Sequence, residues 1–334
     1  MSIYNNAPIK PAKFSWSRNQ NIEDLKVSDW VQPVWETEAN KNTDWDVVLI
    51  GAPLSRSSIS VSGASEFPDY FRRSWDKFST YNIDEDLDLR ALSIADLGDV
   101  MMHYTEILQS HRNIHDVMTE VCRRFPTSFP ITIGGDHSIT AQTVKGMKAA
   151  FPDKTIGILQ FDTHLDLRST EEHGPTNGTP IRQLLEVGVV KGRHVHNLGL
   201  HGFFNAPSLI KAAKIYEVQY IPLGHIRKQG IRETVTASLE KLQKEVDLIY
   251  VTVDIDVLDI AYAQGVPAST PGGMRTDELF AALSEVGKCS AVKAIDFVCI
   301  DPTKDTPAMA TVKTTTYAVL TFLTSYLRSR KFSS

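Results

Sequence analysis

Six His and Asp side chains stand directly after apolar runs in three separate parts of the sequence. In the central part they occupy alternate positions, as Asp162, His164 and Asp166. The full set is His137, Asp162, His164, Asp166, Asp254 and Asp256. Because alternate residues of an extended chain point to the same side, these side chains can converge where the strands end. Four carboxylates and two imidazoles are too many for one zinc ion and suit two hard cations.

Each of these residues, taken alone, also has an ordinary structural explanation. Asp136 can cap a helix that begins near Ser138, and His137 can be a core histidine. That explanation weakens when three strands end in this way, since adjacent carboxylates at a buried edge repel one another unless a cation compensates them. The ligand set favours two Mn²⁺ ions, with Zn²⁺, Ni²⁺, Co²⁺ or Fe²⁺ as substitutes. Two such ions can lower the pKa of a shared water and present hydroxide to an electrophilic carbon, which predicts a hydrolase.

The elements that must position these residues alternate between short apolar runs and helical stretches. The predicted strands are 47–50, 91–95, 131–133, 156–160, 194–198, 218–221, 248–253 and 292–295. The predicted helices include 114–124, 140–150, 231–245 and 276–285. This alternation is typical of an α/β fold, in which a largely parallel sheet is covered on both faces. Ligands of such sheets gather at the carboxyl ends of the strands, where the six residues lie.

Residues 1–44 differ from the rest of the chain, because Trp16, Trp30 and Trp35 stand among polar residues without a clear period. A disordered tail would rarely keep three tryptophans, so we predict an N-terminal arm that packs on the body or on a neighbouring subunit. Residues 45–334 show no internal repeat and no linker-like change of composition. We therefore predict that they form a single catalytic domain.

The composition argues against several classes of protein. The chain has 334 residues, of which 42% are hydrophobic and 22% charged, as in an ordinary globular protein. Its net charge of −5, without a basic stripe, argues against nucleic-acid binding. We see neither a membrane-length apolar run nor a signal peptide, and we expect a cytoplasmic protein without a membrane partner. Cys122, Cys289 and Cys299 have no CxxC spacing, which argues against a disulfide framework.

From about Val47 to the C-terminus the chain resembles the ureohydrolase superfamily, which includes arginases, agmatinases, guanidinobutyrases, proclavaminate amidinohydrolases and formimidoylglutamases. The resemblance rests on Gly134-Gly135-Asp136-His137-Ser138, Asp162-Thr163-His164-Leu165-Asp166 and Asp254-Ile255-Asp256-Val257-Leu258-Asp259, supported by Gly51-Ala52-Pro53, Gly265-Val266-Pro267 and Pro271-Gly272-Gly273. It implies an arginase-like, three-layer αβα fold with an eight-stranded, mainly parallel sheet. It also implies a dinuclear Mn²⁺ centre, hydrolysis of a C–N bond in a linear amidine, and a homo-oligomer, either a trimer or a hexamer.

The resemblance further implies how the ligands are shared. One metal would take His137, Asp162, Asp166 and either Asp254 or Asp256, and the other would take Asp162, His164, Asp254 and Asp256. Asp166 resembles the ligand that also hydrogen-bonds the attacking hydroxide and relays its proton to the leaving amine, so it is the predicted catalytic residue.

The substrate is predicted from the loop at 174–185, which resembles that of formimidoylglutamases. Asn177 stands where arginases and agmatinases have His, and Arg168 stands where arginases have Asn. A guanidinium at Arg168, with a second at Arg182, suits a small amidine that bears carboxylates. The resemblance therefore implies hydrolysis of N-formimidoyl-L-glutamate to glutamate and formamide, a step of histidine degradation. In the alternative, Arg168 pairs only with a glutamate of its own loop.

Cys299 is the main departure from the superfamily, which generally has a Glu there to hold the cationic end of the substrate. Loss of such a charge-assisted hydrogen bond costs about 1.5–3 kcal/mol. We therefore keep Cys299 as a candidate substrate contact, although a small apolar filler is the simpler interpretation. Two other functions stay open: an agmatinase-like or arginase-like guanidino hydrolase that releases urea, and a catalytically impaired member with a binding or regulatory role.

Overall fold

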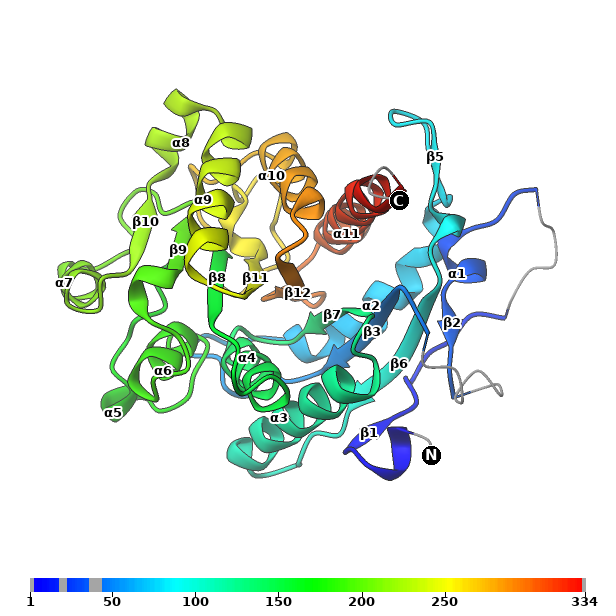
Figure 1. Ribbon diagram of the computed structural model, residues 1–334, viewed down its shortest axis with the longest axis horizontal. Coiled ribbons are helices and arrows are strands. Elements are labelled where there is room, and N and C mark those ends of the chain that lie inside the picture. The colour runs from blue at the N-terminus through cyan, green and yellow to red at the C-terminus, as the bar shows by residue number, and fades with distance from the viewer. Residues whose placement is uncertain (1–2, 18–22, 36–43, 332–334) are drawn as a thin grey trace.

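A central sheet of ten strands organises the computed structural model, which describes residues 3–17, 23–35 and 44–331 (Figure 1). Its order is β1-β6-β3-β7-β12-β11-β8-β9-β10, with β2 also paired to β6. The strands are β1 (Ile9–Lys10), β2 (Gln32–Pro33), β3 (Val47–Ala52), β6 (Ile94–Val100), β7 (Phe129–Gly134), β8 (Ile156–Phe161), β9 (Val195–Leu198), β10 (Gln219–Ile221), β11 (Leu248–Asp254) and β12 (Val292–Val298). Only β1 runs antiparallel to its neighbour within this sheet of the described residues.

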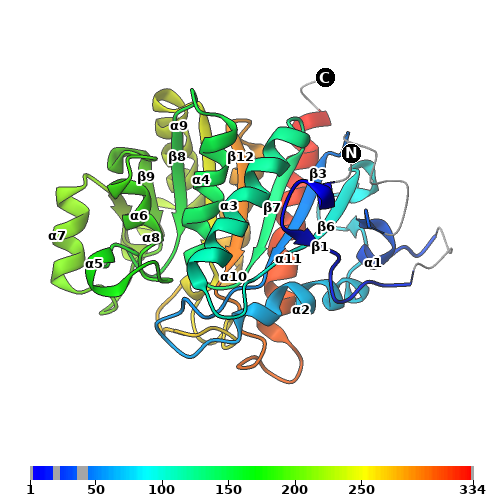
Figure 2. The same cartoon turned by 90° about the horizontal axis from the view of Figure 1, so that it is seen from below.

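Helices cover both faces of the sheet, which gives three layers (Figures 1 and 2). One face packs against α3 (Ile107–Arg124) and α4 (Ser138–Ala150), and the other against α9 (Ile231–Glu245), α10 (Thr276–Lys288) and α11 (Ala310–Lys331). The remaining helices are α1 (Val27–Trp30), α2 (Phe67–Arg73), α5 (Thr170–His173), α6 (Pro180–Glu186), α7 (Pro207–Ile215) and α8 (Leu223–Gln229). Short 3₁₀ turns are η1 (Ile3–Asn5), η3 (Ala64–Glu66), η4 (Ser74–Lys77), η5 (Leu89–Ala91), η6 (Gly192–His194) and η7 (Ile255–Val257), and β4 (Tyr81–Asn82) and β5 (Leu87–Asp88) form a separate hairpin.

The central strands are apolar on both sides because both of their faces are covered. Every residue of β3, β7 and β8 is buried. In β11 the alternation separates two cores: Tyr250 belongs to the core under α3 and α4, whereas Val251 and Val253 belong to the core under α9, α10 and α11. The predicted α/β fold with a mainly parallel sheet is confirmed.

The eight predicted strands correspond to β3 and to β6 through β12. The second was placed too early, at 91–95, because Leu89–Ala91 forms a 3₁₀ turn that the Asp88 carboxylate caps, and β6 begins only at Ile94. The sheet also gains β1 and β2 from the N-terminal segment, so it is wider than the predicted eight strands. The helix predicted at 231–245 has those bounds in the structure.

The N-terminal segment lies against the body through its tryptophans. The Trp16 Nε1–H donates to the carbonyl oxygen of Arg72 at 2.7 Å, and the Trp30 Nε1–H donates to that of Leu92 at 2.9 Å. Trp35 is half-buried. The predicted arm also includes residues 1–2, 18–22 and 36–43, which lie outside the described residues, as do residues 332–334 of the predicted catalytic domain. The boundary at residue 44 stays a prediction.

No helix in the described part of the chain has both the length and the apolar character that crossing a bilayer would need.

Candidate metal centre

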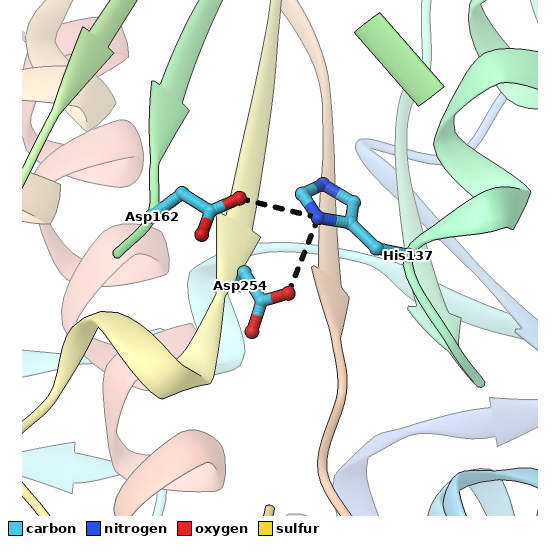
Figure 3. Close-up of side chains that lie close together, drawn as sticks. All are labelled: His137, Asp162 and Asp254. Atoms are coloured by element: carbon cyan, nitrogen blue, oxygen red, sulfur yellow. Dashed lines mark ion pairs between the residues drawn. The ribbon is translucent and has the colours of Figure 1, made fainter. Parts of the chain in front are cut away.

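The predicted ligands come from the carboxyl ends of three strands that lie near one another in the sheet. His137 directly precedes α4 after β7, Asp162 follows β8, and Asp254 is the last residue of β11. In the sheet β11 lies beside β8, and β12 alone separates β11 from β7. The fold therefore brings side chains more than a hundred residues apart to one edge (Figure 3).

His137 is the centre of the first group of ligands. Its Nδ1 lies 2.7 Å from Asp166 Oδ2, 3.2 Å from Asp254 Oδ2 and 3.3 Å from Asp162 Oδ2. Figure 3 shows Asp162 and Asp254 approaching the same ring nitrogen from two strands. Three carboxylates around one imidazole nitrogen are a typical set for a divalent cation.

His164 is the centre of the second group. Its Nδ1 lies 3.1 Å from Asp256 Oδ2 and 3.5 Å from Asp162 Oδ1. The two oxygens of Asp162 thus face two different imidazoles, which is the arrangement of a bridging carboxylate. Ligand atoms of His137, Asp162 and Asp254, and those of Asp162, His164 and Asp256, each fall within 4.8 Å of one another. The site is built for two neighbouring cations.

Local hydrogen bonds orient these carboxylates. Asp162 Oδ1 accepts from the His164 N–H at 2.6 Å, and Asp254 Oδ1 accepts from the Asp256 N–H at 3.0 Å. Asp166 has a left-handed backbone with φ of +54°, which is costly for a residue other than glycine and is common at functional sites. This conformation turns the Asp166 side chain toward His137.

Burial and mutual repulsion dominate the electrostatics. Burial, together with the charges of Asp256 and Asp162, raises the pKa of Asp254 to about 8. Burial and the charge of Asp162 raise the pKa of Asp166 to about 6. Although burial alone would lower it, the carboxylates of Asp256 and Asp162 raise the pKa of His164 to about 12. These pKa shifts indicate that the carboxylates of the site carry more negative charge than the neighbouring positive groups balance.

Buried nitrogen and oxygen atoms of the cluster that lack hydrogen bonds are a further sign of metal binding. Among the described residues Asp256 Oδ1 is buried without a hydrogen-bond partner, and His137 Nδ1 and Asp166 Oδ2 lie 2.7 Å apart without the geometry of a hydrogen bond. Buried polar atoms rarely stay without a partner in a native protein, so several in one cluster indicate a bound ion. Nitrogen and oxygen donors in this mixture suit Mn²⁺ and similar divalent cations.

A small cavity of about 110 Å³ opens beside the ligands. Its walls come from the loop after β3, the loop after β8 and the loops that follow β9 and β11. They comprise Ile59, Ser60, His164, Asp166, Arg168, Asn177, Gly178, Phe204, Leu209, Asp254, Asp256 and Ala268. A substrate in this cavity would touch ligands of both metal groups.

Arg168 presents a free cation to the cavity. Its side chain is exposed and, among the described residues, makes no hydrogen bond or ion pair, so neither Glu171 nor Glu172 neutralises it. The Arg168 side chain lies across Gly178, where an added Cβ would come 2.8 Å from Arg168 Cδ. The glycine thus leaves space for the arginine beside the metal ligands.

Asn177 lines the cavity, and its side chain also binds the loop after β3, which forms another wall. The Ile59 N–H donates to Asn177 Oδ1 at 2.8 Å, while the Asn177 N–H donates to the carbonyl oxygen of Ser57 at 3.1 Å. Asn177 therefore joins the loop after β3 to the loop that contains Gly178.

Arg182 and Cys299 are not brought to the cavity. The Arg182 Nε–H donates to Glu186 Oε1 at 2.5 Å, and the guanidinium lies 4.7 Å from the ring centre of Tyr216. Cys299 is buried, and burial together with the charge of Asp254 raises the pKa of its thiol well above the usual value. Both stay predicted substrate contacts for which the structure offers no contact surface.

Two residues that support the ligands were not predicted. The Gln160 side chain donates to Asp162 Oδ2 at 2.6 Å, and period two along β8 places it on the same side as Asp162, which is a readable signal. Asn205 accepts from the Leu165 N–H at 2.9 Å and donates to the Thr163 carbonyl oxygen at 2.8 Å. Asn205 lies 40 residues beyond this loop, and no local pattern reveals the contact.

The fold and the site define an α/β protein with a dinuclear metal centre at the carboxyl edge of its sheet. The chain belongs to the arginase family, whose model matches residues 45–325. This confirms the resemblance to the ureohydrolase superfamily.

Among individual relatives the chain is similar to formimidoylglutamases. It is 42% identical to that of Halalkalibacterium halodurans over 275 residues, covering 82% of this chain and 85% of the relative. It is 38% identical to that of Bacillus subtilis over 280 residues, covering 84% and 86%. The crystal structure of the Bacillus subtilis enzyme superposes with a TM-score of 0.86 at 34% identity, covering 94% of this chain and 95% of that one. A Trypanosoma cruzi formiminoglutamase with Mn²⁺ shares the fold, with a TM-score of 0.81 at 22% identity, covering 91% and 99%.

Proposed function

We propose that this protein is a formimidoylglutamase, which hydrolyses N-formimidoyl-L-glutamate to glutamate and formamide. The proposal is supported above all by the guanidinium of Arg168, which has no partner among the described residues and lies in the wall of a cavity lined by metal ligands. A substrate for this cavity needs a carbon that water can attack and a carboxylate that an arginine can bind. The names of the relatives at 38% and 42% identity support the same substrate.

The metal is proposed to be Mn²⁺, because the mixed set of carboxylates and imidazoles suits it and a structural neighbour is described with that ion. The residues that would hold it are the six predicted ligands, His137, Asp162, His164, Asp166, Asp254 and Asp256. When bound, the pair of cations supplies a water of lowered pKa as the nucleophile for the formimino carbon.

The protein's own groups then orient the substrate and move a proton. The guanidinium of Arg168 binds a substrate carboxylate through two parallel N–H donors and holds the formimino group over the ligands. A carboxylate oxygen of Asp166, which lines the cavity, accepts the proton of the attacking water and passes it to the glutamate nitrogen. The bond between the formimino carbon and that nitrogen breaks, which releases glutamate and formamide.

A substrate panel tests the proposal. The Mn²⁺-loaded protein is given N-formimidoyl-L-glutamate, agmatine, arginine and 4-guanidinobutyrate, and formamide, urea and ammonia are measured. We expect formamide from the first compound and less urea from the others, with the least from agmatine, which lacks a carboxylate for Arg168. Faster urea release from a guanidino compound would overturn the substrate, and no hydrolysis at all would favour an impaired member of the family.

The family resemblance also leads us to propose a homo-oligomer, either a trimer or a hexamer, and we keep the expectation of a cytoplasmic protein. Light scattering of the purified full chain distinguishes these states, and a monomer at micromolar concentration would contradict the proposal.

A further inference from the structure

A further carboxylate, Asp296, lies in the interior behind the metal centre. It stands within β12 and is fully buried, and it forms no ion pair with any described Lys or Arg. It is not one of the predicted ligands, and it lines no wall of the substrate cavity. An isolated buried carboxylate is costly, so its presence in the interior calls for a physical reason.

The register of the sheet places Asp296 beside a strand that ends in a ligand. In the parallel pair of β11 and β12, Asp296 is the partner of Thr252. Because side chains alternate along a strand, Tyr250, Thr252 and Asp254 point to one face of β11, the face covered by α4. Asp254 reaches the metal ligands at the end of that row, and the two hydroxyl groups precede it.

Two hydroxyl groups donate to the Asp296 carboxylate, and each of them has a further hydroxyl group beside it. Thr140 Oγ1 donates to Asp296 Oδ2 at 2.7 Å, and the Tyr250 hydroxyl donates to the same atom at 2.8 Å. Thr143 Oγ1 in turn lies 2.8 Å from the Tyr250 oxygen. Thr252 Oγ1 lies 3.3 Å from Thr140 Oγ1. Because the single Thr140 proton points to Asp296, the Thr140 oxygen is left to accept from the Thr252 hydroxyl.

Thr252 connects this group to a metal ligand. Its Oγ1 lies 2.9 Å from His137 Nε2, the ring nitrogen that points away from Asp162 and Asp254 in Figure 3. Since the single Thr252 proton is directed toward Thr140, the Thr252 oxygen is left to accept from an Nε2–H. A neutral His137 with its proton on Nε2 has a lone pair on Nδ1, the atom that faces the three carboxylates.

We propose that Asp296 is a positioning residue of the metal centre, which acts on His137 through Thr140 and Thr252. The chain Asp296–Thr140–Thr252–His137 holds the imidazole in the orientation and tautomer that bind a cation. The proposal rests on the proposed function only in requiring divalent cations, and it does not depend on the substrate.

The second histidine ligand lacks this support, which makes the effect specific to one half of the site. The His164 side chain is 27% exposed, and its Nε2 has no hydrogen-bond partner among the described residues. Weakening the chain behind His137 should therefore loosen the cation on the His137 side and leave the His164 side nearly unchanged.

The test measures Mn²⁺ binding to the full-length protein, by calorimetric titration and by metal content after dialysis. Asp296→Asn removes the charge, and Thr252→Val removes the connecting hydroxyl at constant shape. Each is expected to weaken one of the two Mn²⁺ ions by about 10- to 100-fold, the usual cost of losing an outer-shell partner. Thr252→Ser keeps the hydroxyl and should restore wild-type affinity.

Tyr250→Phe is the matched control, because it removes another hydrogen bond to the same Asp296 oxygen without touching His137. We expect it to keep both Mn²⁺ affinities. Wild-type Mn²⁺ binding by Thr252→Val, or equal loosening by Tyr250→Phe, would overturn the proposal. A wild-type protein that binds two Mn²⁺ but releases no formamide would instead contradict the substrate assignment alone.

Discussion

The backbone N–H of Arg168 donates to the carbonyl oxygen of Gly178 at 3.1 Å, and the side chain of the same arginine lies across that glycine. An alanine at 178 would bring its Cβ 2.8 Å from Arg168 Cδ and 3.2 Å from Arg168 Nε. At these distances the atoms would overlap, so the flexible side chain of Arg168 would have to move away. The position of the Arg168 guanidinium beside the metal ligands therefore depends on glycine at 178.

We expect Gly178→Ala to displace Arg168 and to raise KM for N-formimidoyl-L-glutamate while both metals stay bound. The reason is that the substitution moves a carboxylate-binding group without changing any ligand. Steady-state kinetics together with metal content check this, and an unchanged KM would show that the guanidinium does not need its present position.

Arg168→Ala removes that group outright. A charge-assisted hydrogen bond contributes about 1.5–3 kcal/mol, so kcat/KM should fall about 10- to 100-fold. If the interaction is equal in ground and transition states, the loss appears chiefly in KM.

Arg182→Ala is the control for Arg168→Ala, because Arg182 pairs with Glu186 on its own helix and does not line the cavity. We expect a clearly smaller loss of kcat/KM from it than from Arg168→Ala. Equal losses from both substitutions would contradict the assignment of the substrate carboxylate to Arg168.

Metal removal should lower stability as well as activity. Without cations, Asp162, Asp254 and Asp256 repel one another in a buried site. A metal present at 100 times its Kd contributes about 2.7 kcal/mol to folding, so chelation should lower Tm and added Mn²⁺ should restore it. Calorimetry with and without EDTA measures the difference, and equal Tm values would mean that the carboxylates do not bind an ion.

Asp162→Asn tests the bridging position, since Asp162 alone faces both imidazoles in the cluster of described residues. We expect the metal content to fall below two ions per chain and kcat to fall more than about 100-fold, the upper range for outer-shell changes. Full activity with two bound metals would contradict the bridging role.

The ligand cluster could be predicted from sequence because two simple rules are enough. The strand-end rule for parallel sheets brings the residues after β7, β8 and β11 to one edge. Alternation predicted Asp162, His164 and Asp166 on one side, although the chain leaves the extended conformation after Phe161 and Asp166 reaches His137 from a left-handed backbone. Neither rule requires the strand order. The two-residue strands β1 and β2 were missed for the opposite reason, since segments this short have no period.

The substrate contacts were harder to predict because they depend on competing partners. Arg168 and Arg182 look equivalent in sequence, yet Arg182 has a glutamate four residues later on one helix, a spacing that predicts an ion pair. Cys299 does not line the cavity although its thiol lies beside Asp254, and it has a left-handed φ of +66°, which no local pattern indicates. The contact between Thr252 and Asp296 requires the register of β11 against β12, and the sequence does not contain it.

The pH dependence of stability should include a contribution far from the metal centre, from His196 on β9. Its side chain is buried, and Nε2 has no hydrogen-bond partner among the described residues. Burial and the charge of Lys241 lower the pKa of His196 to about 4, while Glu245 partly opposes them.

In the unfolded chain the pKa of this histidine returns to about 6.5, so below that pH the unfolded state binds more protons. The contribution of His196 is therefore present above pH 6.5 and is lost as the pH falls toward 4, by up to about 3 kcal/mol in the free energy of unfolding. Urea unfolding at pH 7, 5.5 and 4.5 should show a smaller decline for His196→Gln than for the wild type. His225→Gln, at an exposed position, should decline as the wild type does. If His196→Gln also declines as the wild type does, His196 is not among the groups that destabilise the protein in acid.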